Sequence, residues 1–196
     1  MSFPNIIPLW KAAVEPVKYF VDANIWIYSL QKFEDLERWE DKYYQFFFDI
    51  VDSTITPKPK ILLPTLLLSE IINTYLRKFA IPEYRQINNI PAATVIDFKR
   101  DYRPTQHYKD SYEKMMDDIS SLHSSIQFID DHSIAYNDAV LFNKSIGSFD
   151  YNDHLYYSLC VELNKTERII MLTNDGDYQV NDFEIVTSNR TLLNLR

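Results

Sequence analysis

The chain has 196 residues, is 46% hydrophobic and carries a formal net charge of −8 at pH 7. This apolar content suits one large globular domain, and we treat residues 1–196 as a single domain with an irregular or helical insertion at about 81–125. The acidic balance argues against a protein that coats nucleic acid with positive charge, because phosphate binding draws on Lys and Arg. With only two glycines, Gly147 and Gly176, a glycine-rich phosphate loop is excluded as well.

The cysteine content and the N-terminal region indicate the compartment. The single cysteine, Cys160, cannot form an internal disulfide and suits a reducing environment, so we expect a cytoplasmic protein. The first twenty residues lack a basic region followed by an apolar run, and nowhere do 18 apolar residues stand together. We therefore expect neither a signal peptide nor a membrane span.

Short β-prone runs alternate with stretches of helical periodicity along the chain. The runs cover residues 17–21, 61–63, 126–129, 169–172 and 183–187. Such alternation is typical of a parallel sheet. The first and fourth runs are apolar almost throughout, which indicates central strands covered on both faces. We expect an α/β fold, namely a three-layer α/β/α sandwich around a mostly parallel sheet of four to five strands.

Apolar residues at three- and four-residue spacing predict the helices. Two helices begin near Asn24 and Asp153. Four others cover residues 36–50, 67–79, 108–122 and 136–144. Residues 81–107 contain three prolines and no sustained period, so we expect an irregular connection there.

Two stretches near this connection concentrate positive charge. Their basic residues are Arg77, Lys78 and Arg85 in one stretch and Lys99, Arg100 and Arg103 in the other. Tyr84 and Tyr102 would add surfaces on which bases can stack. A solvated helix face explains the same residues, and both interpretations stay open.

Acidic residues follow two of the predicted central strands. Asp22 comes directly after the run VKYFV, and Asp175 and Asp177 come shortly after IIML. Open parallel sheets bind ligands at the carboxyl ends of their strands, so these side chains are candidates for a site. Helix capping also explains Asp22, and an ordinary turn also explains the other two.

Glu70 and Asp153 bring two further segments to the same edge of the predicted sheet. Glu70 lies in the first turns of the helix after the strand ILLP, and Asp153 opens the helix after SFDYN. Carboxylates brought together repel one another unless a cation compensates. Oxygen ligands without His or Cys suit Mg²⁺ or Mn²⁺ rather than zinc.

Four segments together resemble the PIN-domain family: VDANIWIY, LPTLLLSEIINTYLR, SFDYNDHLYYSLC and IIMLTNDGDY. The resemblance implies a PIN-like α/β/α fold and a set of acidic metal ligands. Carried over segment by segment, the ligands are Asp22, Glu70, Asp153 and Asp175, with Asp177 as an additional acid and Asn24 and Thr173 as supporting residues.

The resemblance also implies a function. PIN domains are typically Mg²⁺- or Mn²⁺-dependent endoribonucleases that hydrolyse RNA phosphodiester bonds, and many are toxins of toxin–antitoxin pairs. RNA is then the substrate, and an antitoxin or another protein is the partner. The alternatives are a noncatalytic PIN module that binds RNA or protein, and a metal-dependent DNA nuclease. The sequence leaves open whether the chain forms a homodimer.

Overall fold

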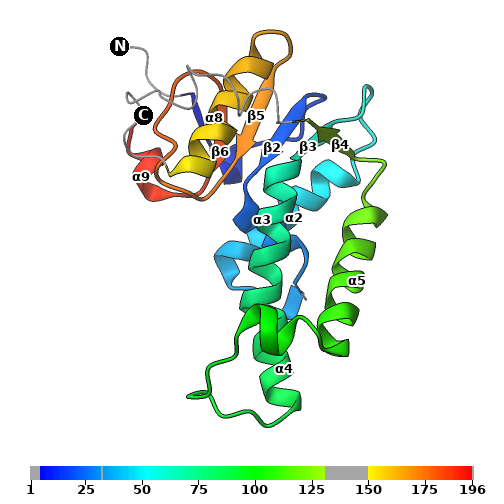
Figure 1. Ribbon diagram of the computed structural model, residues 1–196. Coiled ribbons are helices and arrows are strands. Elements are labelled where there is room, and N and C mark those ends of the chain that lie inside the picture. Colours follow the sequence, from blue (N-terminus) through cyan, green and yellow to red (C-terminus); the bar gives the residue numbers. More distant parts are fainter. Residues whose placement is uncertain (1–4, 32, 131–149, 196) are drawn as a thin grey trace.

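The computed structural model describes residues 5–31, 33–130 and 150–195, in which strands and helices alternate (Figure 1). The strands are β1 (Ile6–Pro8), β2 (Lys18–Val21), β3 (Lys60–Pro64), β4 (Ile126–Ile129), β5 (Ile169–Leu172) and β6 (Glu184–Thr187). They form one sheet in the order β1-β6-β5-β2-β3-β4, and every pairing is parallel. The helix expected at 136–144 lies outside the described residues.

The helices between these strands are α1 (Ala23–Ser29), α2 (Arg38–Val51), α3 (Thr65–Tyr75), α4 (Ile81–Ile87), α5 (Gln106–Ser121) and α8 (Tyr151–Asn164), and α9 (Arg190–Leu193) follows β6. Shorter helical turns are η1 (Leu9–Lys11), η2 (Phe33–Asp35), η3 (Leu76–Ala80) and η4 (Phe98–Tyr102), of which the last two are π-helical. None of the helices described is both long and apolar enough to cross a membrane.

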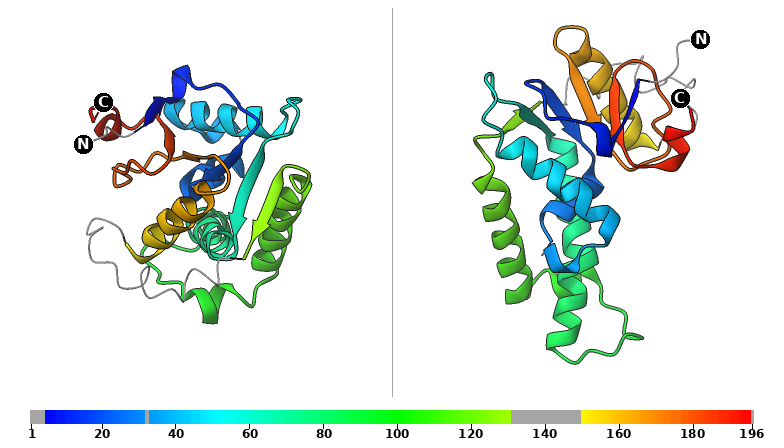
Figure 2. Two further views of the ribbon diagram at one scale, coloured as in Figure 1. Left: turned by 90° about the horizontal axis from the view of Figure 1, so that it is seen from above. Right: turned by 180° about the vertical axis from the view of Figure 1, so that it is seen from behind.

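The helices cover both faces of the sheet. Seen from above, α2 lies on one side of the strands, and α3 and α8 lie on the other (Figure 2). The central strands β2 and β5 are almost wholly buried, as expected for strands that are apolar on both faces. The predicted α/β/α fold class is therefore confirmed.

The sheet described has six strands rather than the four to five expected. The additional strand is β1, which pairs with β6 at one edge. It is three residues long and ends in Pro8. A run this short carries no period that distinguishes it from a loop, and proline is tolerated on an edge strand.

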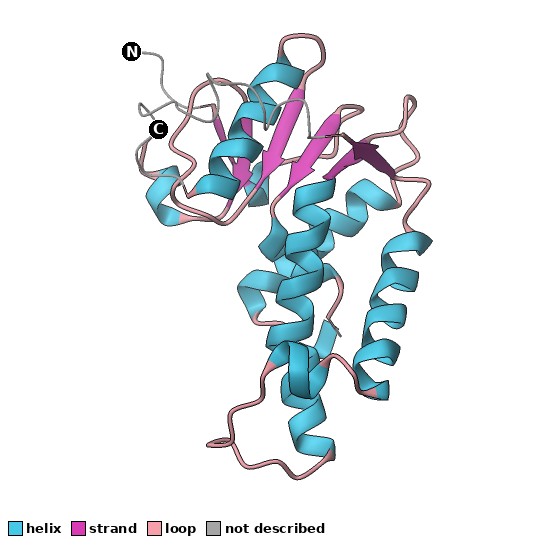
Figure 3. Ribbon diagram, in the orientation of Figure 1, coloured by secondary structure: helices cyan, strands magenta, loops and turns pink. Residues whose placement is uncertain are grey.

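Residues 81–107 are more regular than expected. α3 leads through the π-helical turn η3 directly into α4, and η4 forms a second helical turn before α5. Pro82 lies in the first turn of α4, where the missing N–H is tolerated, so it does not break the helix. We call residues 76–105 the arm, because α4 and the loop after it project away from the sheet (Figure 3).

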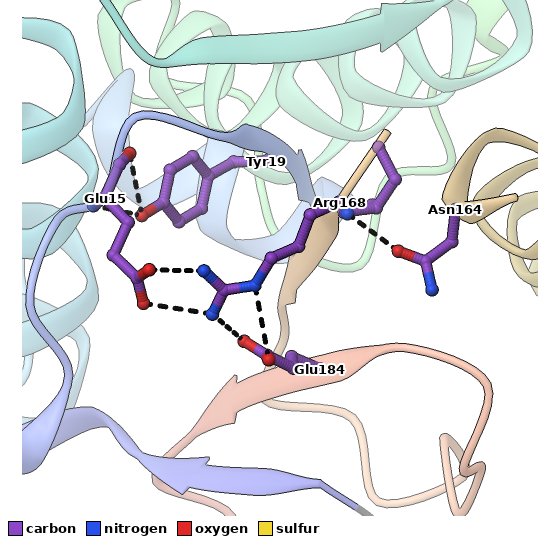
Figure 4. Close-up of polar contacts among 6 residues, drawn as sticks. Glu15, Tyr19, Asn164, Arg168 and Glu184 are labelled. Carbon is purple, nitrogen blue, oxygen red and sulfur yellow. Dashed lines mark hydrogen bonds and ion pairs between the residues drawn. The ribbon is translucent and has the colours of Figure 1, made fainter. Parts of the chain in front are cut away.

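Charged side chains form an ion cluster at the edge where the strands begin. Arg168, just before β5, donates to the carboxylates of Glu15 and Glu184 (Figure 4). Lys18, at the start of β2, pairs with Glu167 at 2.6 Å. We call these five residues the amino-edge cluster, and they join the segments that lead into β2, β5 and β6.

Candidate functional site

Asp22 lies at the carboxyl end of β2 and caps α1. Its Oδ1 accepts the Asn24 main-chain N–H at 3.3 Å, so the capping role is real. Its Oδ2 accepts the Thr173 hydroxyl at 2.7 Å, which links it to the residue after β5. Burial raises the pKa of Asp22, the two hydrogen bonds lower it, and the negative charges of Asp175 and Glu70 raise it. The resulting pKa is about 6.

Glu70 lies on α3 and is held by residues of α8. Its Oε2 accepts the Tyr156 hydroxyl at 2.8 Å and the Asn152 side-chain amide at 3.2 Å. Two neutral donors from one helix therefore fix a carboxylate on another. This contact also ties α3 to α8 on one face of the sheet.

Asp153 lies in the first turn of α8 but does not cap it. Asp150 is the cap, and its Oδ1 accepts the Asp153 main-chain N–H at 3.0 Å. The Asp153 carboxylate instead accepts the Tyr178 hydroxyl at 2.9 Å. Burial raises the pKa of Asp153, the hydrogen bond from Tyr178 lowers it, and the charges of Asp150, Asp175 and Asp22 raise it. The resulting pKa is about 7.

The two acids after β5 differ in their surroundings. Asp175 is half-buried, and its charge raises the pKa of both Asp22 and Asp153. Its main-chain N–H donates to Thr173 Oγ1 at 2.9 Å. Asp177 is exposed, and its main-chain N–H donates to Asp175 Oδ1 at 2.9 Å. Asp175 thus belongs to the acidic group, and Asp177 lies at its rim.

Several residues of this edge did not stand out in the sequence. Tyr156 follows the apolar stripe of its helix and Tyr178 is almost fully buried, so both resemble core residues until their hydroxyls are located. Tyr43 is similar, because its buried hydroxyl accepts the Ser188 main-chain N–H at 2.7 Å and holds the ends of β5 and β6 together. Asn152 could have been suspected as the neighbour of Asp153.

The carboxyl edge therefore gathers Asp22, Glu70, Asp153 and Asp175 from four segments. Among residues 5–31, 33–130 and 150–195, however, no three or more His, Cys, Asp and Glu side chains stand in an arrangement that could already hold a metal. The donor chemistry fits Mg²⁺ or Mn²⁺, since every donor is a carboxylate oxygen. An ion would have to draw these side chains together.

Comparison with known proteins supports the fold. Neither a family model nor a curated protein sequence matches the chain. The chain is similar to a crystal structure of VapBC2 from Rickettsia felis bound to a DNA fragment from their promoter, with a TM-score of 0.50 and 12% identity over 87% of this chain and 98% of that chain. Identity this low bears on the fold alone, and it agrees with a PIN-like α/β fold.

Proposed function

We propose that the chain is a metal-dependent endoribonuclease of the PIN type. In this proposal Asp22, Glu70, Asp153 and Asp175 bind Mg²⁺ or Mn²⁺, and RNA phosphodiester bonds are hydrolysed at the carboxyl edge. The observation that carries the proposal is geometric: acids from four segments lie at one edge of the sheet, and the hydrogen bonds to Asp22, Glu70 and Asp153 come from uncharged hydroxyl and amide groups. The raised pKa values of Asp22 and Asp153, about 6 and 7, agree with this arrangement. Such a group of acids is stabilised by a cation from outside the chain.

The residues around the acids have distinct roles in this proposal. Thr173 orients Asp22, Tyr178 orients Asp153, and Tyr156 and Asn152 together fix Glu70. A bound divalent ion would polarise a phosphoryl oxygen and lower the pKa of its water. Asn24 supports the site through its main chain, and Asp177 adds negative charge at the rim.

We further propose that a protein partner covers this edge when the nuclease is held inactive. The fold resembles that of VapBC2 from Rickettsia felis bound to a DNA fragment from their promoter. Four carboxylates at one edge would accept a basic segment of an antitoxin or another partner. An acidic site of this kind attracts basic chains whether or not it is catalytic.

A noncatalytic module that binds RNA or protein is the second candidate. It is favoured by the absence, within the described part of the chain, of a preformed group of three metal ligands. A cleavage assay separates the two functions. A DNA nuclease is tested in the same assay.

The test uses labelled single-stranded RNA and matched DNA, incubated with Mn²⁺, Mg²⁺ or EDTA. Asp22→Asn and Asp153→Asn remove a charge from the site with little change of shape, and Asp49→Asn removes one from the exposed face of α2 as a control. We expect metal-dependent RNA cleavage in wild type and in Asp49→Asn, and none in folded site variants. Folded wild type that cuts neither substrate would favour the noncatalytic module, and cutting of DNA alone would favour the DNA nuclease.

A further inference from the structure

We propose that the arm, residues 76–105, binds the phosphates of single-stranded RNA and guides the strand to the carboxyl edge. The identity of the strand as a substrate rests on the proposed function. The binding itself is a separate property of the arm and can be measured without cleavage.

The arm has the opposite charge to the rest of the chain. It contains six Lys and Arg residues and three Asp and Glu residues, a net charge of +3. Since the whole chain carries −8, the remaining residues carry −11. A polyanion approaching this protein is therefore attracted more strongly to the arm than to the rest of the chain taken as a whole.

The arm continues the helix that carries Glu70. α3 begins at the carboxyl end of β3, and η3 and α4 extend its course away from the sheet (Figures 1 and 3). At a rise of 1.5 Å per residue, Arg77 and Lys78 lie about 10–12 Å beyond Glu70 along the helix. An RNA strand bound to these two cations would lie beyond the carboxyl ends of the β-strands, which is the edge where the acids lie.

The arm is ordered by a small core that it shares with α3 and α5, so the backbone that carries its charges has a fixed position. Leu76, Ala80 and Tyr102 are buried together in it. The guanidinium carbon of Arg77 lies 4.5 Å from the centre of the Phe98 ring, which holds an exposed cation in place.

Two of the arm's arginines are already used within it. Arg85 donates to the main-chain oxygens of Pro91 and Thr94, at 2.9 and 2.5 Å, and Arg100 pairs with Asp101. The other cations, Arg77, Lys78, Lys99 and Arg103, are exposed and form no ion pair with any residue that the structure describes. These four are the phosphate-binding candidates.

The exposed aromatic surface beside the arm lies on α5, and Tyr84, one of the two tyrosines considered from the sequence, is half-buried. Tyr102 is fully buried and cannot stack with a base. Tyr112 on α5 is 38% exposed and stacks on Tyr108 at 6.2 Å between ring centres. Both line an open cavity of about 480 Å³ with Arg103 and Lys109, and with two acids, Glu113 and Asp117.

Cations next to an exposed ring are the combination that single-stranded nucleic acid binds, with phosphates on the cations and bases on the ring. An acidic protein segment would use the cations alone. The arm thus fits RNA better than an acidic protein, and this difference is the basis of the test.

Binding of a fluorescent 12-nucleotide RNA is measured in EDTA as a function of salt. The Lys78→Gln/Lys99→Gln variant removes two arm charges, and Lys58→Gln/Lys165→Gln removes two exposed lysines at the amino edge as the matched control. We expect the slope of log affinity against log salt to become shallower by about 1.4 in the arm variant. The control should behave as wild type, and equal slopes in all three proteins would overturn the proposal.

Tyr112→Ala separates RNA from an acidic protein as the occupant. We expect RNA affinity to fall by about 5-fold or more, because a base loses its stacking partner, while the affinity for polyglutamate is unchanged. Polyglutamate binding that is tighter than RNA binding would assign the arm to a protein partner and overturn the proposal. Wild type that cleaves RNA without arm-dependent binding would contradict this inference alone, and arm-dependent binding without cleavage would contradict the nuclease alone.

Discussion

The two edges of the sheet both collect carboxylates, but they compensate the charge in different ways. At the amino edge Glu15 and Glu184 are paired with Arg168, and Glu167 is paired with Lys18. At the carboxyl edge the hydrogen bonds to Asp22, Glu70 and Asp153 come from hydroxyl and amide groups.

The pKa values follow this difference. Hydrogen bonding to Arg168 lowers the pKa of Glu15, whereas burial raises the pKa of Asp22 and Asp153. The same type of side chain is thus paired with cations at one edge of the sheet, whereas at the other edge Asp22, Glu70 and Asp153 form no ion pair with any residue among 5–31, 33–130 and 150–195. The first arrangement is structural, and the second suits an external ligand of opposite charge.

The largest expected effect comes from removing a charge at the carboxyl edge. Asp22→Asn or Asp153→Asn should lower RNA cleavage in Mn²⁺ by about 100-fold or more, since loss of a partner of a metal ligand alone costs 10–100-fold. The cleavage rate of a labelled RNA measures it. Activity within twofold of wild type in either folded variant would remove that residue from the site.

The stability of the same edge should depend on pH in a defined direction. A carboxyl whose folded-state pKa is raised favours folding while it is protonated, and this contribution is lost as the pH rises from about 4 to 7. In EDTA we expect the Asp22→Asn/Asp153→Asn variant to match wild type near pH 4 and to be more stable at pH 8. We expect a difference on the order of 3 kcal/mol, less than roughly 1.4 kcal/mol per pKa unit would give, because both carboxyl groups are partly exposed. Urea unfolding across this range measures the difference, and a variant less stable at pH 8 would contradict the account.

A smaller effect is expected from the donor to Asp153. Tyr178→Phe removes the hydroxyl that Asp153 accepts but keeps the buried ring. We expect Mn²⁺ affinity to fall about 10-fold, because the carboxylate loses the group that orients it. Titration calorimetry measures this affinity, and Tyr157→Phe, which changes a tyrosine bonded to Asp182 instead, is the matched control.

The smallest effect is expected at the amino edge. Arg168→Met leaves Glu15 and Glu184 without their shared cation, and we expect a loss of about 1 kcal/mol of stability because the group is partly exposed. Cleavage by the folded variant should not change. Reduced activity at unchanged stability would mean that the two edges are coupled, and it would contradict a purely structural role for the amino edge.

The sequence predicts the elements that show a regular pattern of apolar residues and the acids that directly follow such an element. The apolar runs around Phe20 and Met171 indicate buried central strands, and the positions of Asp22 and Asp175 after these strands indicate the edge to which they belong. These features depend on local chain order, which the sequence contains.

Other parts depend on contacts between distant residues. The hydroxyls of Tyr156 and Tyr178 reach carboxylates 86 and 25 residues away, and no spacing rule reveals such a pair. α4 was missed because Pro82 suggests a break, whereas a proline in the first turn of a helix is tolerated. The sequence leaves the burial of Tyr102 open, because the small core that buries it forms only when η3 and η4 meet.

The most direct test of the central claim is a calorimetric titration of Mn²⁺ into wild type, Asp153→Asn and Asp49→Asn at pH 8, which is above the pKa values of Asp22 and Asp153. We expect Mn²⁺ to bind to wild type and to Asp49→Asn, and this binding to be lost in Asp153→Asn. Equal binding by all three proteins, or no binding by wild type, would contradict the claim that the carboxyl edge is a cation site.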